Sequence, residues 1–191
     1  MKPKVLVVIG PSGVGKSTLF SRLRQEGVVR VVHTWTTRKS RYYEDPVNAD
    51  HVFTDEAEFT AREQEGFFLD TVQLFGLDAR YGLPREVLEC DGDSIRAVML
   101  RAMLLQRLPR NFPAHIVYQV EAPRARVEAH LQARVERDGD IGSRLANFED
   151  ELQQGRRLAH RIIDNSGPPD EVLAQLSAWL CEDFAGDRSA A

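Results

Sequence analysis

The chain of 191 residues contains only two cysteines, Cys90 and Cys181. Two cysteines so far apart cannot form the disulfide framework of a small secreted protein or the knuckle of a metal site. Long apolar runs are also missing. The first one, residues 5–9, is too short for a signal peptide, and no stretch approaches the ~20 residues that cross a bilayer. We therefore expect a cytoplasmic protein without a membrane segment.

An excess of positive charge is absent as well, since the formal net charge is −4. This balance disfavours a broad nucleic-acid-binding face, although local arginines could still bind small phosphorylated ligands. The hydrophobic fraction of 42% is that of an ordinary globular protein, and the chain shows no internal repeat or low-complexity tract. We expect one domain, as a monomer or homodimer, that acts on a small anionic substrate and binds no nucleic acid.

The sequence does contain a phosphate-binding loop. Residues 10–17 read GPSGVGKS, match G-x-x-x-x-G-K-[ST] at every fixed position, and directly follow the apolar run 5–9. In such a loop the glycines let backbone N–H groups surround a β-phosphate, Lys16 reaches the β- and γ-phosphate oxygens, and the Ser17 hydroxyl holds Mg²⁺. A glycine-rich turn without a ligand would need neither side chain. The motif predicts that the protein binds ATP and Mg²⁺, with Ser17 as the metal ligand. The residues expected to contact the nucleotide are Gly10, Ser12, Gly13, Val14, Gly15, Lys16, Ser17 and Thr18.

Apolar runs alternate with helical segments along the chain, and this order predicts an α/β fold. The expected strands lie at about residues 5–9, 28–33, 95–100, 115–120 and 161–163. The expected helices lie at about 16–25, 55–64, 84–89, 101–108, 123–136, 143–158 and 169–180. Because strand, helix and strand follow one another from the start, the sheet should be parallel. The predicted fold class is the P-loop NTPase three-layer sandwich with a parallel core sheet, a small acceptor-binding subdomain and a helical lid.

The remaining segments suggest how one domain at residues 1–183 is divided. Residues 34–50 are polar and aromatic and read as a long loop, which suggests a functional role, and 67–72 look extended. The polar segment 137–142 separates two helices and carries an arginine, as a lid would. We expect a core at about 1–33, 92–125 and 156–183, an acceptor-binding region at about 34–91, a lid at about 126–155 and a frayed tail at 184–191.

The loop alone does not fix the reaction, because kinases, motor ATPases and GTPases share it. A GTPase should contain an Asn-Lys-x-Asp tetrad, and none is found. Arginines instead occur in two groups, Arg38 and Arg41 after the second strand, and Arg134, Arg137 and Arg144 around the expected lid. Transfer of a phosphoryl group between two anions needs cations on both donor and acceptor. This favours a small-molecule kinase, although the second group could also be a solvated helix face.

At these residues the chain resembles the guanylate kinase family over nearly its whole length. The matching motifs are the loop at 10–18, TWTTRKSRYYE at 34–44, GFFLD at 66–70, Tyr81-Gly82, the lid arginines and IIDN at 162–165. The resemblance implies that the acceptor phosphate is bound by Thr34, Arg38, Arg41 and Tyr81. The other roles it suggests are catalysis by Lys16, Arg38, Arg134 and Arg144, nucleotide contacts from Arg137 and Asn165, and acceptor contacts from Glu44, His51, Asp70 and Arg101.

The positions that read guanine in that family differ here. Asp70 replaces a Glu, Leu83 replaces a Ser or Thr, Arg101 stands near the place of an Asp, and His51 replaces a second phosphate-binding Tyr. A site discriminates a base by hydrogen bonds only if its polar groups are present. Leu83 offers none and Arg101 reverses the charge, so the sequence predicts a lost guanine pocket beside a retained phosphate clamp.

This profile resembles the ribose 1,5-bisphosphate phosphokinases of phosphonate breakdown, which belong to the same superfamily. The cues are the apolar residue after Tyr81-Gly82, Asn48 and His51, and Arg101-Ala102, whereas Arg41, Glu44 and Ser17 look more like guanylate kinase. We predict transfer of the ATP γ-phosphoryl to a phosphate of a small acceptor, with ribose 1,5-bisphosphate favoured, giving phosphoribosyl diphosphate. Three alternatives stay open: a true guanylate kinase acting on GMP, a non-catalytic binding module, and an ATPase motor or switch.

Overall fold

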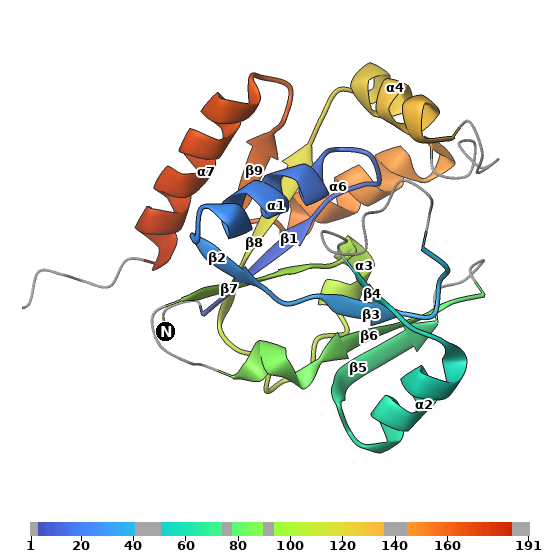
Figure 1. The fold of residues 1–191 in the computed structure, drawn as a ribbon. Coiled ribbons are helices and arrows are strands. Elements are labelled where there is room, and N and C mark those ends of the chain that lie inside the picture. Colours follow the sequence, from blue (N-terminus) through green and yellow to red (C-terminus); the bar gives the residue numbers. More distant parts are fainter. Residues whose placement is uncertain (1–3, 41–50, 74–77, 90–93, 136–144, 185–191) are drawn as a thin grey trace, which may run out of the picture.

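The main sheet is parallel and has five strands in the order β2-β7-β1-β8-β9 (Figure 1). It belongs to a computed structural model that describes residues 4–40, 51–73, 78–89, 94–135 and 145–184, with the backbone alone at 134–135. All residues of the central strand β1 are buried, which explains its unbroken apolar sequence. The strands are β1 Val5–Ile9, β2 Val29–Val31, β7 Ile95–Met99, β8 His115–Glu121 and β9 Arg161–Asp164.

Helices cover both faces of this sheet and complete three layers (Figure 1). On β1, Leu6 and Val8 join the core cluster that also contains apolar residues of α1 and α7. The alternate residues of β1 point to the other face and join the cluster that contains α3. There Gly155 of α6 packs closely against Gln119 of β8. These helices are α1 Lys16–Gln25, α3 Ala102–Leu105, α6 Phe148–Leu158 and α7 Pro169–Phe184.

A buried polar group joins α7 to the sheet. The hydroxyl of Tyr118 on β8 donates to the carboxylate of Asp183, and Arg161 on β9 donates to the same carboxylate through Nε at 2.7 Å and Nη2 at 2.6 Å. The Arg161 hydrogen bonds hold the pKa of Asp183 below its ordinary value, whereas burial and the hydrogen bond to Asp183 raise the pKa of Tyr118. The Arg161 guanidinium also lies over the Trp179 ring, 5.0 Å from its centroid.

A second, smaller sheet lies below the first in Figure 1 and has the order β4-β3-β6-β5. Strand β3 pairs with β4 in parallel, and β6 lies antiparallel to both β3 and β5. Helix α2 lies against this sheet, capped by Asp55, whose side chain accepts from the backbone N–H of Glu58 at 2.8 Å. The elements are β3 Thr34–Thr36, β4 His51–Phe53, α2 Glu56–Gln64, β5 Phe68–Gln73 and β6 Arg80–Pro84.

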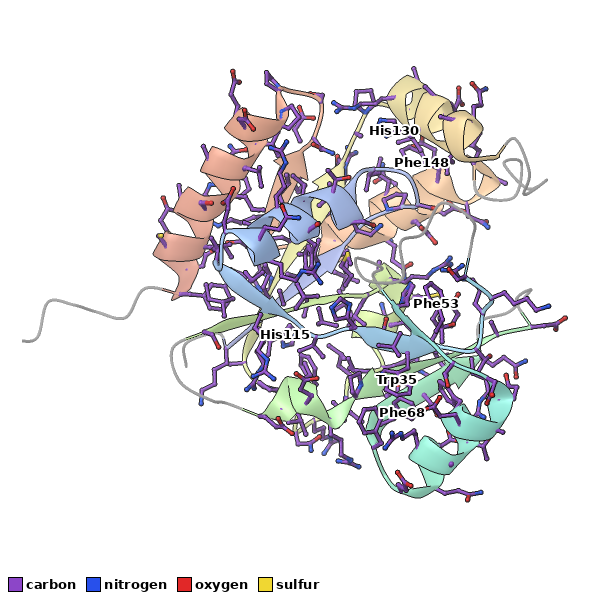
Figure 2. All side chains as sticks on the ribbon, viewed as in Figure 1. Trp35, Phe53, Phe68, His115, His130 and Phe148 are labelled. Carbon is purple, nitrogen blue, oxygen red and sulfur yellow. The ribbon has the colours of Figure 1, made fainter. Side chains whose placement is uncertain are left out.

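One face of the smaller sheet forms an aromatic core with α2. The rings of Phe59 and Phe68 stack with centroids 4.6 Å apart, and Trp35 meets Phe67 edge-on at 5.1 Å. A Cβ added at Gly82 would lie 2.6 Å from the Phe68 ring, so only glycine fits beneath it. Figure 2 shows Trp35 and Phe68 together on this side, with Phe53 nearer to the main sheet. The opposite face is therefore the one available to a ligand.

The predicted parallel sheet and its α/β class are confirmed, but three local predictions were wrong. Residues 34–36, expected in a loop, form β3, because their two threonines are buried and pair with neighbouring strands. The short helix at 84–89 is a 3₁₀ turn, Arg85–Leu88, and only Ala102–Leu105 of the segment 101–108 is α-helical.

No helix in the described parts of the chain combines the length and apolarity needed to cross a membrane.

Candidate active site

The phosphate-binding loop lies between β1 and α1 and uses its glycines for close packing. Gly10, Gly13 and Gly15 have φ of +143°, +88° and +95°, in the region that disfavours other residues. A Cβ at Gly10 would lie 2.5 Å from the Val120 carbonyl oxygen, and one at Gly15 would lie 2.3 Å from Nδ2 of Asn165. The loop therefore packs tightly against the end of β8 and the residue that follows β9.

Lys16 and the start of α1 make this loop cationic. The ammonium of Lys16 donates to the carbonyl oxygens of Gly10 at 2.7 Å and Pro11 at 2.8 Å, so it lies against the loop itself. Helix α1 starts after Gly15 with no side-chain cap and no acidic residue in its first turn. An uncapped helix N-terminus beside a lysine suits an anion. Ser17, the expected Mg²⁺ ligand, follows Lys16 in that first turn, so the residues present fit a metal-bound triphosphate.

Two side chains outside the loop, Asn165 and His130, hold its backbone, and a third, Arg126, holds Asn165. Nδ2 of Asn165 donates to the Val14 carbonyl at 2.8 Å, and Arg126 donates to the carbonyl of Asn165 at 2.7 Å. Nδ1 of His130 lies 3.2 Å from the Gly13 carbonyl, to which it donates when protonated at that nitrogen. Arg126 and His130 lie on α4, Arg124–Val135, and Figure 2 labels His130. Asn165, expected to contact nucleotide, is buried and uses its amide to support the loop. No sequence motif indicates the roles of His130 and Arg126.

A cluster of polar and aromatic groups lies on the open face of the smaller sheet. Thr34 Oγ1 and His51 Nδ1 share a hydrogen bond of 2.6 Å, and the His51 ring meets the Tyr81 ring edge-on with centroids 5.7 Å apart. Strand register explains the grouping, because Thr34 pairs with His51 and Thr36 pairs with Tyr81. The structure thus brings together three of the residues predicted to bind the acceptor.

Arg38 follows β3 and lies beside this cluster. Its backbone N–H donates to Thr36 Oγ1 at 3.1 Å, and its guanidinium lies 5.0 Å from the centroid of the Phe53 ring. Phe53 in turn contacts His51 edge-on, with centroids 6.3 Å apart. A guanidinium, two hydroxyls and an imidazole in one region can together bind a phosphate.

Asp70 and Arg101 are both engaged in ion pairs. Oδ2 of Asp70 on β5 lies 3.6 Å from Nε of Arg107, which follows α3. Arg101, at the end of β7, lies 3.3 Å from Oε1 of Glu151 on α6. Leu83 pairs with Asp70 across the sheet and is 6% exposed, within the core cluster that contains α3. A hydrocarbon side chain at that position offers no hydrogen bond to a base.

Glu121 ends the strand β8 that borders β1, and it is neutralised by an arginine. Arg156 of α6 donates to its two carboxylate oxygens at 2.8 Å and 2.6 Å, and these bonds lower the pKa of Glu121. Gln119 adds a bond of 2.7 Å to the same carboxylate. The ion pair limits negative charge at the sheet edge where the phosphate-binding loop lies, which favours an anionic ligand there.

Comparison with known proteins identifies the family. No family model matches the chain. It is 34% identical over 176 residues to a guanylate kinase of Oleidesulfovibrio alaskensis, covering 85% of this chain and 80% of that protein. It is 31% identical over 183 residues to the ribose 1,5-bisphosphate phosphokinase PhnN of Ruegeria sp., covering 94% and 92%. The chain belongs to the guanylate kinase family.

The fold agrees with this assignment. The crystal structure of guanylate kinase from Anaplasma phagocytophilum matches with a TM-score of 0.67 at 20% identity, covering 97% of this chain and 88% of that one. The predicted resemblance, fold class and enzyme class are confirmed, and this guanylate kinase family member is a phosphotransferase.

Part of the predicted site lies outside the described residues. Arg41, Glu44, Arg137 and Arg144 fall in segments that the structure does not describe, and the side chain of Arg134 is not described either. Their roles stay predictions. In the described part of the chain, no group of three or more His, Cys, Asp or Glu side chains could hold a metal ion.

Proposed function

We propose that this guanylate kinase family member transfers the γ-phosphoryl group of ATP to a phosphate of a small phosphorylated sugar, with ribose 1,5-bisphosphate as the favoured acceptor. One observation carries the choice of acceptor. The face of the smaller sheet brings together Thr34, His51 and Tyr81, whose hydroxyls and imidazole suit a phosphate. Leu83, at a base-reading position of the family, is a buried hydrocarbon. A site of this kind binds a phosphate without reading guanine.

The donor half of the reaction rests on the loop and α1. Lys16 and the N-terminus of α1 would bind the β- and γ-phosphates and stabilise the charge that develops during transfer. Lys16 already lies at the loop, with its ammonium held by the Gly10 and Pro11 carbonyls. Ser17 would hold Mg²⁺, which supplies further charge neutralisation when bound. Asn165 and His130 would keep the loop in its binding conformation.

The acceptor half rests on the smaller sheet. A phosphate oxygen of the acceptor attacks the γ-phosphorus, the new P–O bond forms, and the bond to the β,γ-bridging oxygen breaks to release ADP. A phosphate oxygen is already nucleophilic, so no covalent enzyme intermediate is needed and catalysis comes from alignment and charge stabilisation. Arg38 would hold the acceptor phosphate together with Arg41. The lid arginines Arg134, Arg137 and Arg144 would close over the transferring group.

The acidic net charge and the two cysteines support a cytoplasmic enzyme that acts on a small molecule. A true guanylate kinase is the second candidate, because several relatives carry that name and Asp70 keeps a carboxylate on the acceptor face.

A coupled assay with Mg-ATP tests the proposal directly. Ribose 1,5-bisphosphate should give a kcat/KM at least about tenfold above that of GMP, because Leu83 cannot form a hydrogen bond with a guanine base. A higher kcat/KM with GMP would replace the acceptor while leaving the kinase assignment intact. Lys16→Ala should abolish turnover, whereas Lys4→Ala, a change at an exposed lysine, should not. Full activity in Lys16→Ala would contradict the role of the loop.

A further inference from the structure

Arg107 is a cation on the acceptor side that the sequence motifs do not single out. It follows the short helix α3, and its Nε lies 3.6 Å from Oδ2 of Asp70 on β5. Half of the Arg107 side chain is exposed, at 51%, against 33% for Asp70. A guanidinium carries five N–H donors, so Arg107 can stay beside Asp70 through Nε and still present donors to a ligand.

Strand register places this pair on the same face as the phosphate cluster. Val72 pairs with Tyr81, and Asp70, two residues earlier on β5, pairs with Leu83. Side chains two residues apart on a strand share a face and are separated by about 7 Å. The Asp70–Arg107 pair is therefore displaced along the face from the Tyr81 row by about the length of one sugar unit. An acceptor held by its reacting phosphate near Tyr81 would extend toward Arg107.

The chemistry of this second position suits a phosphorylated sugar. Arginine binds phosphate through paired N–H donors, and a carboxylate accepts hydrogen bonds from hydroxyl groups. Leu83 lies directly opposite Asp70 across the strand pair and contributes only apolar surface beside it. A guanine base carries no anionic group for Arg107 to bind, whereas the second phosphate of a sugar bisphosphate does.

We propose that Arg107 binds a second phosphate of the acceptor, distant from the phosphate that reacts, and that Asp70 accepts hydrogen bonds from the sugar hydroxyls between them. Arg107 is then the residue that selects bisphosphorylated over monophosphorylated sugars. This assignment rests on the proposed function, and it adds a contact that raises affinity for the acceptor without taking part in the transfer. Removal of such a contact raises KM and leaves kcat nearly unchanged.

The test compares ribose 1,5-bisphosphate with ribose 1-phosphate, which keeps the reacting phosphate and lacks the second one. In Arg107→Gln, KM for the bisphosphate should rise about 10- to 100-fold, while KM for ribose 1-phosphate should change by less than about twofold. Arg107→Lys should fall between these, because it keeps the charge and loses the fork. Arg110→Gln is the matched control, since Arg110 is exposed three residues further along the same segment, and it should match wild type.

Asp70→Asn is an independent test. Both acceptors carry the 2- and 3-hydroxyls of the sugar, so both KM values should rise. An Arg107→Gln variant that folds like wild type but loses affinity equally for both acceptors, or for neither, would overturn the assignment. The assignment would also be overturned if Arg107→Gln and Arg110→Gln preferred the bisphosphate over ribose 1-phosphate to the same degree. A wild-type enzyme that phosphorylates GMP and neither sugar phosphate would instead refute the proposed function, so the two failures are distinguishable.

Discussion

Gly15 and Asn165 should be strongly coupled in stability, because they occupy the same space. A Cβ at Gly15 would lie 2.3 Å from Nδ2 of Asn165, the atom that donates to the Val14 carbonyl at 2.8 Å. Asn165→Ala leaves that buried carbonyl without its donor, which costs about 1–3 kcal/mol, and we take about 2 kcal/mol. Gly15→Ala adds backbone strain of about 1–2 kcal/mol at φ +95° and also expels the amide, for about 3.5 kcal/mol in total.

The double variant shows why the two costs do not add. Without the Asn165 side chain the new methyl group meets no amide, so only the strain and the unpaired carbonyl remain. We expect the double variant to lose about 3.5 kcal/mol, near the value of Gly15→Ala alone, instead of the about 5.5 kcal/mol that additivity gives. The coupling of about 2 kcal/mol corresponds to about 4–8 °C in Tm for a chain of this size.

The measurement is urea denaturation followed by far-ultraviolet circular dichroism, without nucleotide, because bound ligand would add its own stabilisation. Gly27→Ala is the control, since Gly27 also has positive φ, +69°, and nothing lies within 4 Å of its added Cβ. It should cost about 1–2 kcal/mol of strain and combine additively with Asn165→Ala. Additive costs for Gly15→Ala and Asn165→Ala would refute the reasoning, because the two side chains would then not meet.

Two further predictions concern parts of the fold distant from the loop. Asp183→Asn should lower the unfolding free energy at pH 7 by about 1–3 kcal/mol, because Arg161 loses a charged partner. Since folding lowers the pKa of Asp183, this contribution is fully present above the unfolded pKa of about 4 and is lost as pH falls through the lower folded pKa. The difference between variant and wild type should therefore shrink in acid, and equal differences at pH 3 and pH 7 would contradict the assignment. Gly82→Ala should cost about 1–3 kcal/mol in thermal unfolding, because its Cβ would meet the Phe68 ring at 2.6 Å. Gly167→Ala, with nothing within 4 Å, should be near neutral, and equal stabilities of the two variants would disprove the close packing.

The features that the sequence predicts well are those set by local pattern. The loop at 10–17 is specified by glycines, a lysine and a hydroxyl at fixed spacing, and β1 is specified by a continuous apolar run. The five parallel strands and the fold class follow from the same periodicity, and the structure confirms them.

The features that were missed depend on distant parts of the chain. Strand β6 contains Gly82 and Pro84, which single-sequence patterns read as breakers, and it is a strand because β3 and β5 pair with it. His130 supports a loop 117 residues earlier in the chain, and Arg107 meets Asp70 only when the segment that follows α3 lies beside β5. Such contacts have no sequence signature, because they join residues that lie far apart along the chain.

The two tryptophans of the chain are divided between the two sheets. Trp35 lies in β3 among the aromatic residues that α2 covers, and Trp179 lies in α7 beneath the Arg161 guanidinium. Each sheet therefore has its own intrinsic fluorophore, and Trp35→Phe or Trp179→Phe would leave emission from one alone. Coincident unfolding transitions in the two variants would show that the donor and acceptor halves form one cooperative unit. Separate transitions would mean that the smaller sheet opens before the larger one, and the emission of Trp35 would then follow that opening in real time.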